Sequence, residues 1–142
     1  MKLVLLPGLD GTGLLFEPLC RELSSSVRPL TLDYPRDRVT SYDELLGLIQ
    51  PRLPTTEPYV LLGESYGGPL ALKIAATRPV GLCGLILTAT FVTCPHGYVP
   101  RAASHLVVPA AFYLAPPLAK LKAIFGRYST PEIQALISRG IA

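Results

Sequence analysis

Apolar residues along the chain fall into short runs that alternate with stretches of helical spacing. The short runs predict buried strands at residues 2–7, 27–34, 59–63 and 81–90. The stretches between them predict helices at residues 14–23, 40–53 and 66–79. This β-α-β-α-β-α-β order predicts an α/β fold, with a parallel sheet of about four strands and flanking helices.

Local signals support two of these helices and a further one near the end of the chain. Ser41 stands three residues before Glu44, which is a capping-box pattern. Pro18 fits the first turn of its helix, where a missing N–H costs little. Ser129 or Thr130 followed by Pro131 predicts a last helical start.

The alternation of predicted strands and helices stops after the fourth predicted strand. From there the chain holds apolar helical pieces interrupted by prolines, and no further strand is predicted. We therefore divide the chain into a core at 1–95 and a helical lid segment at 96–142. The uncharged stretches 79–100 and 102–119 contain glycines, threonines or prolines and fit a membrane-spanning helix poorly.

Composition narrows the class of protein. Hydrophobic residues make up 49% of the chain and charged residues only 16%, against about 25% charged in typical soluble domains. Such a composition suits a sheet covered on both faces. The net charge of +3 is small, and the basic residues are scattered without interleaved aromatic residues, so no nucleic-acid partner is expected.

The cysteines and the N-terminus indicate a cytoplasmic location. Cys20, Cys83 and Cys94 are odd in number and lack CxxC spacing, which predicts free thiols and no metal site. The N-terminal apolar run of four residues before Pro7 is too short for a secretory signal. No cofactor is expected either.

The clearest chemical signal is GESYGG at residues 63–68. It contains the pattern G-x-S-x-G centred on Ser65, between a predicted strand and a predicted helix. This is the setting of a nucleophile elbow, a sharp turn that presents a serine hydroxyl. Gly63 and Gly67 would remove steric clashes in the turn. The helix N-terminus behind Ser65 would stabilise a developing oxyanion.

The glycine-rich loop PGLDGTG follows the first strand at residues 7–13. An oxyanion hole needs two N–H donors, and we expect the backbone N–H groups of Leu9 and Tyr66 to supply them. Asp10 is an alternative donor in that loop. Asp10 and Glu64 are also candidates for the substrate site.

Other interpretations of these motifs stay open at this stage. G-x-S-x-G also occurs by chance in tight turns, and Asp10 is equally well explained as a solvated turn residue. The loop lacks the ending of a P-loop, and Phe16 stands where a dinucleotide fingerprint requires glycine. A nucleotide ligand is therefore not expected.

These residues resemble the α/β-hydrolase superfamily. LVLLPGLDGTG together with GESYGG is similar to small bacterial serine hydrolases and to the hydrolase-like domain of plant phytyl ester synthases. The resemblance covers residues 2–90. It implies ester, thioester or acyl-transfer chemistry through an acyl-serine at Ser65, with oxyanion donors at Leu9 and Tyr66.

The base and acid of a catalytic triad do not follow in the expected order. This fold requires Ser, then an acid, then His. After Ser65 the only acidic residue is Glu132, and the only histidines, His96 and His105, precede it. His96 is a candidate base out of order, whereas Asp33 as the acid would break the family order. The simplest account is that the chain is an N-terminal piece that ends within the lid.

Three functions therefore remain. The first is a serine hydrolase acting on an apolar small-molecule ester or thioester, and the second is an acyltransferase with the same nucleophile. The third is a non-catalytic binding module, which would expose the edge of its fourth strand. The 142-residue chain alone is expected to be inactive, because loss of a triad member costs orders of magnitude in rate. The sequence indicates no oligomeric state.

Overall fold

The computed structural model describes residues 1–38, 40–92 and 130–141. Its four strands form one parallel sheet in the order β2-β1-β3-β4. The strands are β1 (Lys2–Leu6), β2 (Arg28–Thr31), β3 (Tyr59–Glu64) and β4 (Leu82–Thr88). The predicted α/β class and strand number are confirmed, although β2 and β4 end earlier than the sequence pattern predicts.

The helices alternate with the strands as predicted. They are η1 (Leu14–Phe16), α1 (Glu17–Glu22), α2 (Tyr42–Ile49), η2 (Gln50–Arg52), α3 (Gly67–Ala76) and α6 (Pro131–Ile141). Ser41 and Glu44 form the predicted capping box of α2. Pro18 lies in the first turn of α1, and Thr130 caps α6 by accepting a hydrogen bond from the Ile133 N–H. The helix predicted at 14–23 is divided into the 3₁₀ turn η1, which ends shortly before Pro18, and α1. The helix predicted at 40–53 is divided into α2 and the 3₁₀ turn η2, which contains Pro51.

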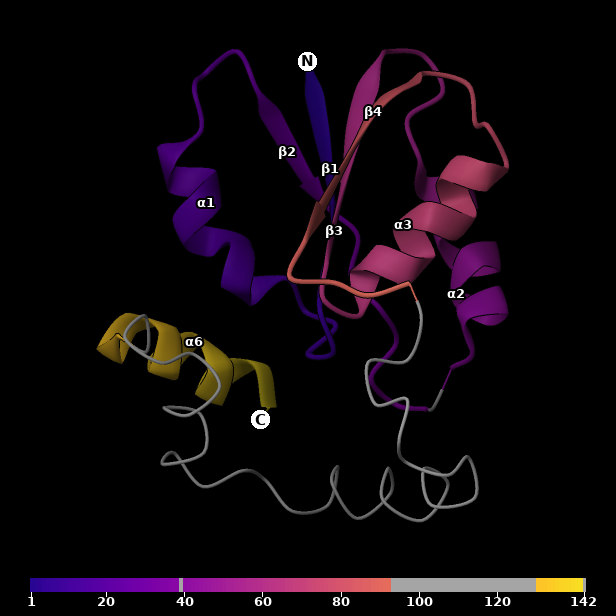
Figure 1. Cartoon of the computed structure of the whole chain (residues 1–142). Helices are drawn as coiled ribbons and strands as arrows, with labels where there is room; N and C mark the ends of the chain where they lie inside the picture. Colours follow the sequence, from indigo (N-terminus) through magenta and orange to yellow (C-terminus); the bar gives the residue numbers. More distant parts are fainter. Residues whose placement is uncertain (39, 93–129, 142) are drawn as a thin grey trace.

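Helices cover the two faces of the sheet unequally (Figure 1). α1 lies on one face, whereas α2 and α3 lie together on the other. Alternate residues of β1 point to opposite faces, with Val4 and Leu6 toward α2 and α3 and Leu3 and Leu5 toward α1. The segment 96–142 lies outside the described residues except for 130–141, so the predicted lid is represented by α6 alone.

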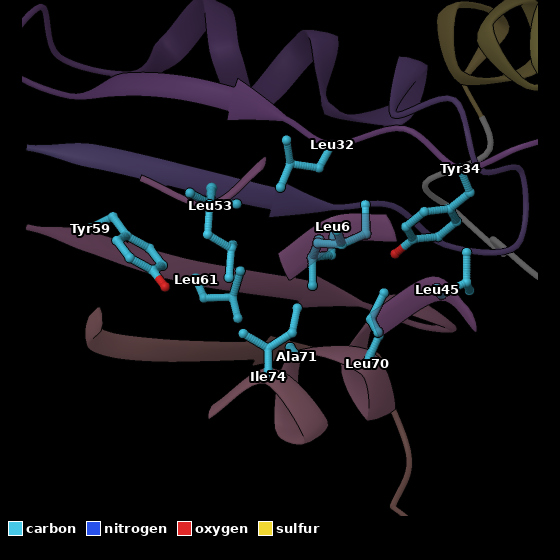
Figure 2. Close-up of a cluster of buried hydrophobic side chains, with 12 residues drawn as sticks. Leu6, Leu32, Tyr34, Leu45, Leu53, Tyr59, Leu61, Leu70, Ala71 and Ile74 are labelled. Atoms are coloured by element: carbon cyan, nitrogen blue, oxygen red, sulfur yellow. The ribbon is translucent and has the colours of Figure 1, made fainter. Parts of the chain in front are cut away.

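The larger core cluster fills the space beneath α2 and α3 (Figure 2). It contains twelve buried residues, including Leu61 of β3 and Leu70 of α3. Tyr59 and Tyr34 lie at opposite ends of this cluster. Burial of this much apolar surface is the main force that holds the sheet against its helices. Within the described ranges, no helix is long and apolar enough to cross a membrane.

Candidate active site

Ser65 and Tyr66 form the turn between β3 and α3, and Ser65 comes first. The Ser65 conformation is the unusual one. Its backbone is left-handed, with φ of 49°, which is unfavourable for a residue with a side chain. Such strain persists only where the surrounding structure fixes it, and it is concentrated at functional sites. The predicted strand–turn–helix setting is present, and it gives Ser65 the backbone of a nucleophile elbow.

Glycines on both sides of Ser65 make the turn possible. A Cβ on Gly63 would lie 2.7 Å from the carbonyl oxygen of Gly67 and 2.8 Å from the Cβ of Ala71. A Cβ on Gly67 would lie 2.6 Å from the carbonyl oxygen of Pro7. Real Cβ atoms do not approach backbone this closely, so both positions require glycine. The contact with Pro7 also places the elbow directly against the loop that follows β1.

Hydrogen bonds fix that loop. The Gly11 N–H donates to the Gly8 carbonyl at 3.1 Å, which closes a turn around Leu9 and Asp10. The buried Tyr34 hydroxyl donates to the Pro7 carbonyl at 3.1 Å, and the Tyr34 N–H donates to the Gly11 carbonyl at 2.9 Å. The loop therefore has a defined shape on its side facing the elbow.

Asp10 stabilises its own loop. One carboxylate oxygen accepts hydrogen bonds from the Thr12 N–H at 3.2 Å and from the Thr12 hydroxyl at 2.5 Å. This is an Asx-turn, in which a carboxylate caps the backbone two residues ahead. The arrangement favours a structural role for Asp10, and its role toward a substrate stays a prediction.

The two predicted oxyanion donors are both without an acceptor in the described part of the chain. Neither the Leu9 N–H nor the Tyr66 N–H donates to any group there. Leu9 is also 61% exposed, at the open side of its loop. Tyr66 lies directly before α3, whose N-terminus carries a partial positive charge. An oxyanion hole requires two such N–H donors, and the placement of Leu9 and Tyr66 in one stays a prediction.

Three tyrosines meet behind the elbow, and the sequence analysis missed them as a group. The Tyr66 ring stacks on Tyr42 with centroids 4.7 Å apart and meets Tyr34 edge-on at 6.3 Å. The Tyr42 hydroxyl donates to the Tyr66 carbonyl at 3.1 Å. Burial raises the pKa of Tyr42 to about 12 and raises the pKa values of Tyr34 and Tyr66 as well. The Tyr34 and Tyr42 hydroxyls donate to backbone carbonyls of the loop after β1 and of the elbow, respectively.

Glu64, the last residue of β3, faces the same loop from the α1 side of the sheet. Burial, and secondarily the charge of Asp10, raises the pKa of the Glu64 carboxyl, while a hydrogen bond from the Gly8 N–H opposes the shift. A Cβ on Gly8 would overlap the Glu64 carboxylate, so glycine at this position makes room for it. The contact ties β3 to the loop that carries Leu9.

A cavity of about 430 Å³ opens beside Glu64. Glu64 and Thr88 provide its polar lining, at the carboxyl ends of β3 and β4. Its apolar lining comes from Leu15, Phe16, Leu19, Leu62, Ile86 and Ile133. The lining is mainly apolar, and Ser65 is not among the residues that line the cavity.

Neither candidate acid, Asp33 or Glu132, has a hydrogen bond or ion pair with Ser65 in the described ranges. His96 and His105 lie outside the described residues. Asp33 forms an exposed ion pair with Arg52 at 2.6 Å, and that hydrogen bond lowers the pKa of Asp33. Glu132 forms an exposed ion pair with Arg21 at 2.5 Å, which joins α6 to α1. In residues 1–38, 40–92 and 130–141, no group of three His, Cys, Asp or Glu side chains is placed to hold a metal ion.

Comparison with known proteins agrees with this geometry. A sequence model of the serine aminopeptidase S33 family of hydrolases matches residues 28–135, more than half of the chain. The chain belongs to this family. The fold of the superfamily, the α/β-hydrolase fold, is thereby shown, and the predicted resemblance is confirmed. No curated protein matches the chain.

Two solved structures have a similar fold. NosK from Streptomyces actuosus is 27% identical, with a TM-score of 0.55, and the match covers 96% of this chain and 61% of NosK. RedJ with a polyethylene glycol molecule bound in its active site is 18% identical, with a TM-score of 0.54 and coverage of 96% and 62%. The chain thus spans about three fifths of the length of these hydrolase-fold proteins.

Proposed function

We propose that this chain carries the nucleophile and the oxyanion hole of a serine hydrolase that cleaves ester or thioester bonds. The carrying observation is the left-handed Ser65, φ 49°, between β3 and α3. It is supported by the N–H groups of Leu9 and Tyr66, which have no acceptor among the described residues. In this proposal the Ser65 Oγ attacks the acyl carbon and transfers its proton to a base. The carbonyl oxygen becomes an oxyanion held by the two N–H donors.

The acyl-serine then reacts with an acceptor. When the acceptor is water the reaction is hydrolysis, and when it is an alcohol the reaction is acyl transfer. The apolar lining of the cavity beside Glu64 supports an apolar acyl group as substrate. The family description adds serine aminopeptidases, which cleave amide bonds, and these also require an acyl-serine.

A histidine base and an acid complete the proposal. We place them outside the described residues, either in the full-length protein beyond the 142 residues or, for the base, at His96. The first source is supported by the longer chains of NosK and RedJ. In this proposal the activity requires a protein that supplies both groups.

The test is labelling of the full-length protein by a fluorophosphonate probe, with turnover of p-nitrophenyl butyrate as a second readout. Ser65→Ala should abolish labelling and turnover. The control Ser138→Ala removes an exposed serine hydroxyl of α6 that bonds only within its helix, and it should leave both unchanged. Labelling that survives Ser65→Ala would contradict the proposal, and a folded protein that never labels would favour the non-catalytic binding module. Added alcohol distinguishes acyl transfer, which yields an ester, from hydrolysis.

A further inference from the structure

The turn that follows β4 holds both backbone polar groups of Ser65. The Ser65 N–H donates to the Thr88 carbonyl at 3.0 Å. The Thr90 hydroxyl donates to the Ser65 carbonyl at 2.7 Å. Thr88 and Thr90 lie on either side of Ala89, so a three-residue segment braces the elbow from the neighbouring strand.

Ala89 has an unusual backbone that makes this bracing possible. Its φ is 47°, in the same left-handed region as Ser65 at 49°. Left-handed backbone is unfavourable for alanine, and it persists where contacts on both sides fix it. Ser65 follows β3 and Ala89 follows β4, and the two hydrogen bonds of Ser65 run to Thr88 and Thr90, the residues on either side of Ala89. An ordinary extended Ala89 would carry the Thr90 side chain away from Ser65.

The sequence also leaves space for the Thr90 hydroxyl. A Cβ on Gly68 would overlap the Thr90 Oγ1 and would lie 2.5 Å from its Cβ. The two glycines after Tyr66 therefore have separate purposes. The missing side chain at Gly67 leaves room for the loop after β1, and the missing side chain at Gly68 leaves room for Thr90.

The hydrogen bond from Thr90 acts on the peptide unit that supplies an oxyanion donor. The Ser65 carbonyl and the Tyr66 N–H belong to one planar amide. A donor on the carbonyl oxygen fixes the plane of that amide and polarises it, which makes its N–H a stronger donor. We propose that the Thr90 hydroxyl positions and polarises the Tyr66 N–H for oxyanion binding. The inference rests on the proposed function of Ser65, and Thr90 is a positioning residue in it.

A second donor shares the same carbonyl. The Gly68 N–H donates to the Ser65 oxygen at 3.1 Å, longer than the bond from Thr90. A carbonyl oxygen has two lone pairs and accepts both. Loss of the Thr90 hydroxyl therefore weakens the oxyanion donor without removing it. We expect a loss of about tenfold in kcat, below the 10²–10³-fold typical when an oxyanion donor is removed outright.

The test compares three substitutions in the full-length protein, with p-nitrophenyl butyrate and a fluorophosphonate as probes. Thr90→Val keeps the shape and removes the hydroxyl, whereas Thr90→Ser keeps the hydroxyl and removes the methyl group. Thr90→Val should lower kcat about tenfold with KM nearly unchanged, because the oxyanion forms only in the transition state. It should slow phosphonylation by a similar factor. Thr90→Ser should stay near the unmodified protein. Thr90→Ala provides the hydroxyl-free variant if valine prevents folding.

Each outcome separates this inference from the proposed function. If Thr90→Val and Thr90→Ala match the unmodified protein while Ser65→Ala is inactive, the positioning role is wrong and the nucleophile stands. If Thr90→Ser falls as far as Thr90→Val, packing of the methyl group matters instead, and the inference is again wrong. If Ser65→Ala retains activity, the proposed function and this inference both fail.

Discussion

β3 and β4 are neighbours in one sheet and have equally apolar sequences, yet their burial differs greatly. Leu61 of β3 is fully buried, whereas its register partner Leu85 of β4 is 36% exposed. One residue further along, Leu62 is 7% exposed and its partner Ile86 is 45% exposed. The cause is position in the sheet. β3 pairs with β1 and β4, whereas β4 pairs, within the described ranges, with β3 alone.

The difference between β3 and β4 shows that the formation of a strand and its burial depend on different features. An apolar run predicts that a strand forms, but its burial is set by what lies beside it. β3 ends in a turn in which both backbone polar groups of Ser65 are hydrogen-bonded and Gly63, Gly67 and Gly68 are closely packed. β4 presents apolar side chains and an edge without a partner strand in the described residues, and natural proteins commonly cover such edges.

The largest expected effect on stability comes from replacing the paired leucines, Leu61 of β3 and Leu85 of β4. Leu61→Ala should lower the free energy of unfolding by about 2–5 kcal/mol, because it leaves a cavity in the core. Leu85→Ala should cost about 1 kcal/mol or less, since its side chain is already partly solvated. Urea denaturation of the 142-residue chain measures both. Equal losses in the free energy of unfolding would contradict the difference in burial between β3 and β4. A larger loss for Leu85→Ala in the full-length protein than in the 142-residue chain would show that further chain covers β4.

The second test compares a glycine of the elbow after β3 with a glycine of β4. Gly67→Ala should destabilise the protein by about 1–3 kcal/mol, because the new methyl group meets backbone carbonyls of the loop after β1. Gly84→Ala, on β4, would place a Cβ 3.3 Å from a Val60 methyl group, a milder contact that a shift of a few tenths of an ångström relieves. Its effect should lie within about 0.5 kcal/mol. Thermal unfolding compares the two, and a tolerated Gly67→Ala would contradict the close approach of loop and elbow.

The third test is the pH dependence of stability at the end of β3. Burial raises the pKa of Glu64, so the folded state holds a proton that the unfolded state has already released. Stability should therefore fall as the pH rises from the ordinary carboxyl range through the raised pKa. Glu64→Gln should remove this part of the pH dependence. The difference between the two unfolding curves is the measurement, and parallel curves would show that Glu64 is not buried as described.

The smallest effect concerns cysteine accessibility. Cys83 of β4 is exposed, whereas Cys20 is partly buried and burial raises its pKa. Iodoacetamide should therefore modify Cys83 before Cys20, because alkylation requires an accessible thiolate. Peptide mapping by mass spectrometry gives the order for each thiol. Faster modification of Cys20 would contradict the exposure of β4, and protection of Cys83 in the full-length protein would show that β4 is covered there.

The sequence predicted the elements well because strands and helices differ in the spacing of their apolar residues. The alternation of apolar runs with helical spacing predicted a parallel sheet of four strands, and G-x-S-x-G located the elbow. The end of β4 was placed two residues too late, at residue 90. The Thr88–Ala89–Thr90 segment leaves the strand through a left-handed alanine, for which the sequence carries no glycine or asparagine signal.

The parts of the site that were missed depend on contacts between distant segments. Tyr34 and Tyr42 reach the elbow from the region after β2, and Thr90 reaches it from the end of β4. Each is an ordinary residue in its local sequence. The one available signal was the double glycine at 67 and 68, because Gly67 completes the G-x-S-x-G pattern of the elbow and the additional Gly68 implies another close neighbour.

The most direct test of the central claim is a crystal structure of the full-length protein after reaction with a fluorophosphonate. We predict phosphorus bonded to the Ser65 Oγ, with the phosphoryl oxygen about 2.7–3.1 Å from the N–H groups of both Leu9 and Tyr66. Phosphorus on another residue, or a phosphoryl oxygen directed away from these two donors, would contradict the assignment of nucleophile and oxyanion hole.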